Sequence, residues 1–129
     1  MEKVTGIGGF FFKSKDPDTL NQWYAENLGI TQSVNGDTST SWWTQAAPSI
    51  FFAESNECEI GKFDKPFYIN FTVENLEAMI KQLEDNSIEI FMKHEETNFG
   101  KFARIYDPEG NLIELWEPSA EVLSHKPSE

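Results

Sequence analysis

The stretch FARIYDPEGNLIELWEP, residues 102–118, predicts two β-strands joined by a tight turn. Alternating runs at Gly100–Tyr106 and Asn111–Glu117 read as the strands. Between them lies Asp107-Pro108-Glu109-Gly110, in which proline presets φ and glycine accepts a positive φ. The residues after Pro118 are polar and are expected to be loose.

Side chains alternate across a strand, so the last strand has two distinct faces. Ile113 and Leu115 form the core-like pair, and Leu112, Glu114 and Trp116 share the opposite face. We therefore expect Glu114 to point into the concave side of a sheet.

Upstream, Pro66–Val73 alternates as a strand and Asn75 can cap a helix that carries Leu76, Met79, Ile80 and Leu83. A further strand is expected at Ile88–Met92. Along the Pro66–Val73 strand, one face is apolar and the other carries Tyr68, Asn70 and Thr72. Polar residues in so apolar a strand suggest a wetted pocket.

The first half of the chain shows a similar order. Strands are expected at Val4–Phe12, Ile30–Val34, Thr38–Thr44 and Ser49–Ala53. Asp16 and Pro17 begin a helix, and Gly29 ends it. In the first strand Phe10 and Phe12 suit packing against this helix, which leaves Phe11 on the concave face.

Strand–helix–three-strand order thus occurs twice, with the halves offset by about 59 residues. One such unit has two sheet faces and a single helix, so it must bury its bare face against a second copy. We expect an α+β fold of one domain over residues 1–129, with two βαβββ modules forming a half-open barrel. The modules are 4–53 and 66–117, with a linker at 54–65 and a polar tail at 118–129.

Length, net charge and cysteine count restrict the functions that this chain can have. The chain has 129 residues and a net charge of −12, which argues against binding to nucleic acids or anionic membranes and is compatible with a cationic ligand. Cys58 is the only cysteine, so an internal disulfide is excluded. Neither a signal peptide nor a membrane span is apparent, and we expect a cytoplasmic protein.

The stretches GIGGFFFKSKDPDTLNQWYAENLGI (6–30) and FARIYDPEGNLIELWEP (102–118) resemble the vicinal oxygen chelate superfamily, which includes glyoxalases and bleomycin-resistance proteins. The resemblance covers residues 4–117. It implies a half-open barrel of two βαβββ modules, a cavity within it and, in general, a homodimer.

Metal-dependent members of that superfamily place four ligands on these strands. In this chain the corresponding positions are Gly9, Tyr68, a residue near Phe51, and Glu114. Glycine has no ligating side chain, and one carboxylate does not make a tight divalent site. We therefore expect no metal and no other cofactor.

The candidate site residues are a catalytic or anchoring Glu114 and the ligand contacts Phe11, Phe51, Tyr68, Asn70, Thr72 and Trp116. Glu114 is either a base or cation anchor, or an acid that is solvated or paired with a nearby cation such as Arg104 on the adjacent predicted strand. The polar residues either orient a ligand or satisfy one another, and the aromatic residues either line a cavity or pack. At most one of the adjacent Trp42 and Trp43 can face the cavity. His94, in a polar stretch, is expected at the surface, and Cys58, between two glutamates, is a poor nucleophile.

Three functions remain open. The favoured one is a homodimer that binds a small cationic or aromatic molecule without a metal, as in the bleomycin-resistance branch. The alternative is a lyase or isomerase of glyoxalase type that uses Glu114 as base, with or without a weakly held divalent metal. The third is a domain that acts through protein contacts.

Overall fold

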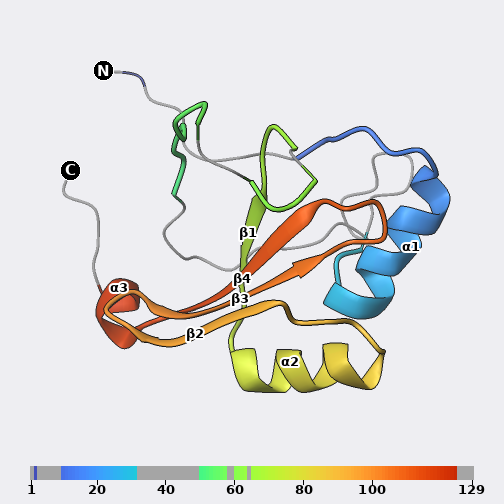
Figure 1. Ribbon diagram of the computed structural model, residues 1–129. Helices are drawn as coiled ribbons and strands as arrows, with labels where there is room; N and C mark the ends of the chain where they lie inside the picture. The colour runs from blue at the N-terminus through green and yellow to red at the C-terminus, as the bar shows by residue number, and fades with distance from the viewer. Residues whose placement is uncertain (1, 3–9, 32–49, 58–59, 64, 125–129) are drawn as a thin grey trace.

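The computed structural model describes residues 2, 10–31, 50–57, 60–63 and 65–124 (Figure 1). Within these residues the elements are, in chain order, α1 (Pro17–Leu28), β1 (Ile69–Thr72), α2 (Leu76–Asp85), β2 (Met92–Thr97), β3 (Gly100–Tyr106), β4 (Leu112–Pro118) and α3 (Ala120–Ser124). No helix in the described part of the chain is long and apolar enough to cross a membrane.

The four strands form one mixed sheet in the order β1-β4-β3-β2. β1 runs parallel to β4, and the other two pairings are antiparallel. Strand, helix and three strands therefore follow one another from β1 to β4, as predicted for the second module. β3 has its predicted bounds, and β4 is offset by one residue.

The turn between β3 and β4 forms as its sequence dictates. The backbone N–H of Gly110 donates to the carbonyl of Asp107 at 3.0 Å, and Gly110 has φ 81°. The Asp107 carboxylate accepts hydrogen bonds from the backbone N–H groups of Glu109 and Asn111, both at 2.9 Å. Asp107 therefore orders the turn with its side chain as well as its backbone.

Both long helices begin at the predicted caps. The Asp16 side chain accepts from the Thr19 N–H, and the Asn75 side chain accepts from the Ala78 N–H. Gly29 ends α1 in the left-handed conformation, with φ 69°.

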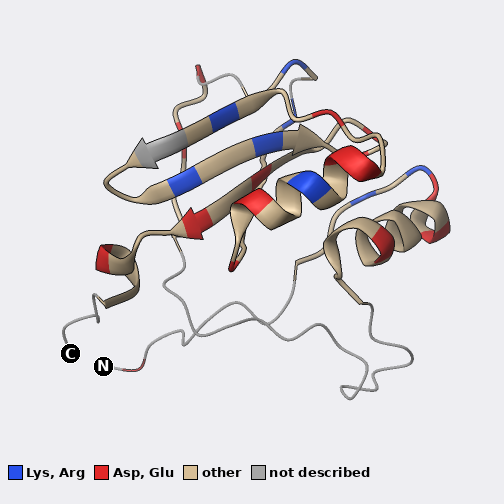
Figure 2. Cartoon of the chain, turned by 90° about the horizontal axis from the view of Figure 1, so that it is seen from below, with Lys and Arg blue, Asp and Glu red and all other residues tan. Residues whose placement is uncertain are grey.

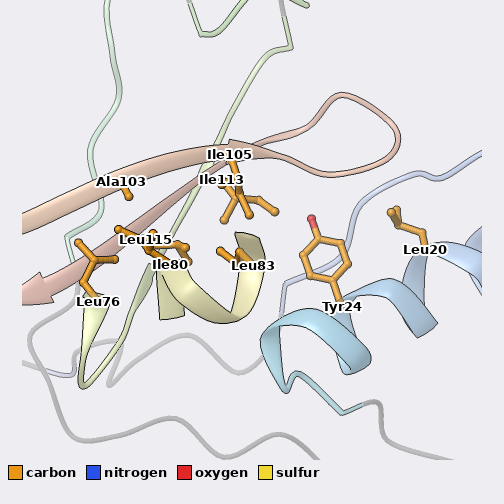
Figure 3. Close-up of a cluster of buried hydrophobic side chains, with 9 residues drawn as sticks. All are labelled: Leu20, Tyr24, Leu76, Ile80, Leu83, Ala103, Ile105, Ile113 and Leu115. Atoms are coloured by element: carbon orange, nitrogen blue, oxygen red, sulfur yellow. The ribbon is translucent and has the colours of Figure 1, made fainter. Parts of the chain in front are cut away.

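The core lies between the helices and one face of the sheet (Figure 3). Ile113 and Leu115 on β4 are buried there, as predicted, together with Ala103 and Ile105 on β3. The helices contribute the remaining buried members, which are Leu20, Tyr24, Leu76, Ile80 and Leu83. α1 and α2 therefore both pack on this face of the sheet and leave the opposite face free of these two helices.

A buried hydrogen bond joins α1 to the β3–β4 turn. The Tyr24 hydroxyl donates to Asp107 at 2.8 Å. Burial, followed by the adjacent Asp107 charge, raises the pKa of Tyr24 above its ordinary 10.0, so the hydroxyl remains a donor. Glu109 in the same turn accepts from the Ser14 hydroxyl at 2.6 Å and from the Lys15 N–H at 2.9 Å, just before α1.

Three predictions for the second half are corrected. The strand expected at Ile88–Met92 begins only at Met92, because Ile88 and Ile90 pack against the core on the way out of α2. β1 is shorter than Pro66–Val73. The tail is not entirely loose, since residues 120–124 form α3.

The two-module half-barrel is not confirmed. Of the four strands expected in the first module, residues 10–12, 30–31 and 50–53 are described, and none of them is in a strand. The rest of those strands, including Gly9, Trp42 and Trp43, lies outside the described residues, as does Cys58. Phe12 does pack against α1 as predicted, with its ring 6.0 Å from that of Tyr24.

Candidate functional site

The sheet face opposite the helices carries Glu114. Residues opposed in register point to the same face, so Asn70 on β1 and Arg104 on β3 lie beside Glu114 on β4. The next row holds Thr72, Trp116 and Phe102. We call this surface the Glu114 face; its members are Tyr68, Asn70, Thr72, Met92, His94, Phe102, Arg104, Tyr106, Leu112, Glu114 and Trp116.

Both oxygens of the Glu114 carboxylate accept hydrogen bonds. Nε of Arg104 donates to Oε2 at 2.8 Å, and Nδ2 of Asn70 donates to Oε1 at 2.8 Å. Glu114 is only 8% exposed. The contacts correspond to the paired alternative of the sequence analysis, because the carboxylate is held by an adjacent cation.

The guanidinium of Arg104 also lies over an aromatic ring. Its Cζ is 5.5 Å from the centre of the Tyr68 ring, within the range of a cation–π contact. Arg104 is thus fixed from two directions, by the carboxylate of Glu114 and by the ring of Tyr68. Two predicted ligand contacts, Tyr68 and Asn70, therefore belong to one cluster with Glu114.

Trp116 and Thr72, two further predicted contacts, lie in the next row of the Glu114 face. Trp116 is 3% exposed, stacks on Phe102 at 5.8 Å and 3°, and donates its indole N–H to the Phe99 carbonyl at 2.9 Å. It is therefore a packed residue. Thr72 lies beside it and is exposed.

Phe11 and Phe51 are 92% and 93% exposed. A cavity wall consists of packed side chains, whereas these two rings stand in solvent. Their role as ligand contacts stays a prediction. His94 lies on β2, and it is exposed as expected.

The donor set does not fit the metal centre of the metal-dependent superfamily members. Phe51 and Gly9 offer no ligating side chain, and the Tyr68 ring lies against a guanidinium. The remaining ligand, Glu114, is bonded to a cation that would repel a metal ion. Among the described residues, no three His, Cys, Asp or Glu side chains gather in a metal-binding group.

Two features were missed from the sequence. A cavity of about 310 Å³ lies at the edge of β1, between α1 and α2, at the lower end of the range for small-molecule sites. It is lined by Leu28, Ile30, Phe71, Thr72, Val73, Glu74, Asn75, Ala78, Met79, Gln82 and Leu115. Both helices contribute to it, and the sequence carries no signal for how they sit relative to each other.

The second missed feature is an aromatic group at the end of the Glu114 face. Tyr106 stacks on Phe91 at 4.5 Å and meets Phe63 edge to face at 5.2 Å. The ammonium of Lys62 lies 5.3 Å from the centre of the Tyr106 ring. The segment at residues 60–63 is thereby held against the sheet, a contact between distant residues that spacing alone does not reveal.

The sequence matches no family model and no curated protein. Solved structures, however, are similar over most of the chain. A protein from the mobile metagenome of V. pseudocholerae has a TM-score of 0.58 at 18% identity, covering 92% of this chain and 98% of that one. TnmS3, an antibiotic-binding protein from Streptomyces, has a TM-score of 0.57 at 17% identity, covering 92% and 100%.

A lactoylglutathione lyase from Agrobacterium tumefaciens has a TM-score of 0.57 at 14% identity, with coverage of 90% of this chain and 96% of that one. At such identities the likeness concerns the fold alone. The fold of this chain is therefore similar to the folds of an antibiotic-binding protein and of a lactoylglutathione lyase, in keeping with the fold that the resemblance in the sequence predicted.

Proposed function

We propose that this chain binds a small organic molecule on the Glu114 face and that binding needs no metal ion. The observation that carries the proposal is the fixed cluster of Asn70, Arg104, Glu114 and Tyr68. It lies on the sheet face that α1 and α2 leave uncovered (Figure 1).

Stability alone gives little reason for such a cluster. Enclosing an ion pair costs desolvation energy that the pair scarcely regains, and apolar residues would stabilise the sheet as well or better. A few oriented polar groups beside aromatic rings are, in contrast, typical of a small-molecule site. The similarity to an antibiotic-binding protein supports the same function.

The proposal includes the quaternary and cellular setting that the sequence suggests, a homodimer in the cytoplasm. A second copy would bury exposed aromatic residues such as Phe51. Light scattering on the eluting protein measures the mass directly, and a monomer at micromolar concentration would remove the homodimer from the proposal.

The binding test is thermal denaturation with a panel of small aromatic compounds, with and without EDTA. A hit should raise Tm equally in both conditions. Tyr68→Leu should abolish the shift, because it removes the ring beneath Arg104. A shift that EDTA removes would contradict metal-free binding.

Ala78→Leu is the matched control. Ala78 lines the cavity at the edge of β1, away from the Glu114 cluster, and leucine retains the helix propensity of α2. A ligand on the Glu114 face should still bind this variant. Loss of the shift in Ala78→Leu, with retention in Tyr68→Leu, would move the site to the cavity.

The second candidate function is a lyase or isomerase of glyoxalase type that uses Glu114 as base. It is favoured by the central position of this little-exposed carboxylate and by the likeness to a lactoylglutathione lyase. Each oxygen of Glu114 already accepts one hydrogen bond, from Asn70 or from Arg104, so a substrate proton would be taken by a remaining lone pair of the carboxylate. Formation of lactoylglutathione, lost in Glu114→Gln, would support this function, and its absence in the wild type would exclude this substrate.

A further inference from the structure

The two members of the Arg104–Glu114 pair differ in their access to solvent. The Glu114 side chain is 11% exposed, and that of Arg104 is 29% exposed. The carboxylate accepts a hydrogen bond on each oxygen, from Asn70 and from Arg104. A ligand approaching this face therefore meets the guanidinium more readily than the carboxylate.

The bond to Glu114 goes through Nε and uses one of the five N–H donors of Arg104. The two terminal nitrogens, which form a planar fork, take no part in this bond. Such a fork matches the two oxygens of a carboxylate. Because Tyr68 and Glu114 already hold the side chain, little rotamer entropy is left to lose when a ligand binds.

We infer that Arg104 is the ligand-binding charge of this face and that the ligand is a planar aromatic molecule bearing a carboxylate. The inference rests on the proposed function and specifies its ligand class. It departs from the cationic ligand that the net charge suggests, since an ammonium group near Glu114 would also approach the guanidinium bonded to it.

The net charge of −12 does not oppose this choice. At physiological salt the field of distant charges decays over about 8 Å, so the nearest groups dominate. Figure 2 shows lysine and arginine on β2 and β3 and acidic residues on the helices and on β4. Among the basic residues of β2 and β3, Arg104 belongs to the Glu114 face, whereas Lys93 and Lys101 alternate to the other face. Within the Arg104–Glu114 pair, the more exposed group is the positively charged guanidinium.

The test is isothermal titration calorimetry with three probes of similar shape: 2-naphthoate, 2-naphthamide and 2-naphthylmethylammonium. The acid should bind about tenfold more tightly than the amide, which matches the worth of a charge-assisted hydrogen bond, and the amine should bind most weakly. Equal binding of acid and amide, or a preference for the amine, would overturn the anionic ligand and leave the proposed function standing. Binding of none of the three would count against both.

Substitutions of Arg104 test whether this side chain causes the preference for the acid over the amide. Arg104→Gln should bring the acid down to the affinity of the amide, and Arg104→Lys should retain only part of the preference because it lacks the planar fork. Lys101→Gln is the matched control: it removes the same charge from β3, where Lys101 pairs with Glu117 at 3.8 Å. A similar loss in Lys101→Gln would show a general charge effect and overturn the role of Arg104.

Arg104→Gln leaves the Glu114 charge unpaired, which threatens the fold. The double variant Arg104→Gln/Glu114→Gln removes both charges and keeps amide groups in their place. It should fold, bind the acid and the amide alike, and show no preference for the amine. A retained preference for the acid would overturn the inference even if the single variant is unstable.

Discussion

The hydroxyl of Tyr24 on α1 donates a 2.8 Å hydrogen bond to Asp107 in the β3–β4 turn, and the two residues are 83 positions apart. Tyr24 is 4% exposed and Asp107 is also 4% exposed. The same carboxylate orders its own turn, so one side chain serves both the local turn and the docking of a distant helix.

Tyr24→Phe should therefore lower the free energy of unfolding by about 1–2 kcal/mol, because Asp107 loses one buried hydrogen bond to its carboxylate while those from Asn111 and Glu109 remain. Urea denaturation measures the change. Tyr106→Phe is the matched control, since the Tyr106 hydroxyl accepts a hydrogen bond from the Lys62 N–H in an exposed contact. An equal loss of unfolding free energy in both variants would mean that the buried Tyr24–Asp107 hydrogen bond stabilises the fold no more than the exposed one does.

The carboxylate of Glu109 should make stability depend on pH. The Ser14 hydroxyl, and then the Lys15 N–H, hold the pKa of Glu109 below its ordinary 4.5. A depressed pKa adds stability that is complete above the unfolded value and is lost as pH falls through the folded value. Wild-type protein should therefore lose this contribution progressively below about pH 4.5.

The measurement is urea denaturation of wild type and Glu109→Gln from neutral pH to pH 3. The difference between them should be largest at neutral pH and should shrink as the carboxylate is protonated. Glu84→Gln, which removes an exposed carboxylate from α2, serves as the control. A difference for Glu109→Gln that stays constant over this range would contradict the prediction.

Much of the second module could be predicted because its signals are local. The alternation in β4 predicted that Ile113 and Leu115 are buried and that Glu114 lies on the other face, as observed. β2 was misplaced because the apolar Ile88 and Ile90 read as a strand, whereas the strand itself is polar and is defined by pairing with β3. Pairing between strands is not visible in the spacing of one of them.

The candidate site could be predicted only in part, for the same reason. Pairing of Glu114 with Arg104 was one of the alternatives that the sequence left open, because both residues lie on adjacent predicted strands, and the structure shows this pair. The bond from Asn70 depends on the register of β1 against β4, and the burial of Trp116 depends on its stacking with Phe102. These are tertiary contacts, which the residue types in the sequence do not specify.

The Arg104–Glu114 pair should show energetic coupling in a double-mutant cycle. Arg104→Gln leaves the carboxylate without its cation and should cost about 1–3 kcal/mol, toward the lower value because Arg104 is partly exposed. The double variant with Glu114→Gln should cost less than the sum of the single variants, by about 1 kcal/mol. Additive losses in urea denaturation would show that the 2.8 Å contact contributes no coupling.

Gly100 at the start of β3 should be the least replaceable of the described glycines. It has φ +124°, and an added Cβ would meet the Glu117 carbonyl oxygen and lie 2.8 Å from the Ser119 nitrogen, both of them backbone atoms that cannot rotate away. Gly100→Ala should therefore cost about 3 kcal/mol or more, from backbone strain and the clash together. The hydrogen bonds between β3 and β4 next to Gly100 should also break in this variant.

Gly29→Ala separates the two causes. Gly29 also has a positive φ of +69°, but an added Cβ would meet nothing within 4 Å, so only the conformational strain of about 1–2 kcal/mol applies. Urea denaturation of both variants, with amide exchange at Lys101 and Glu117 to report on the paired strands, distinguishes them. Equal costs would mean that Glu117 and Ser119 move aside and that the close approach at Gly100 does not constrain the sheet.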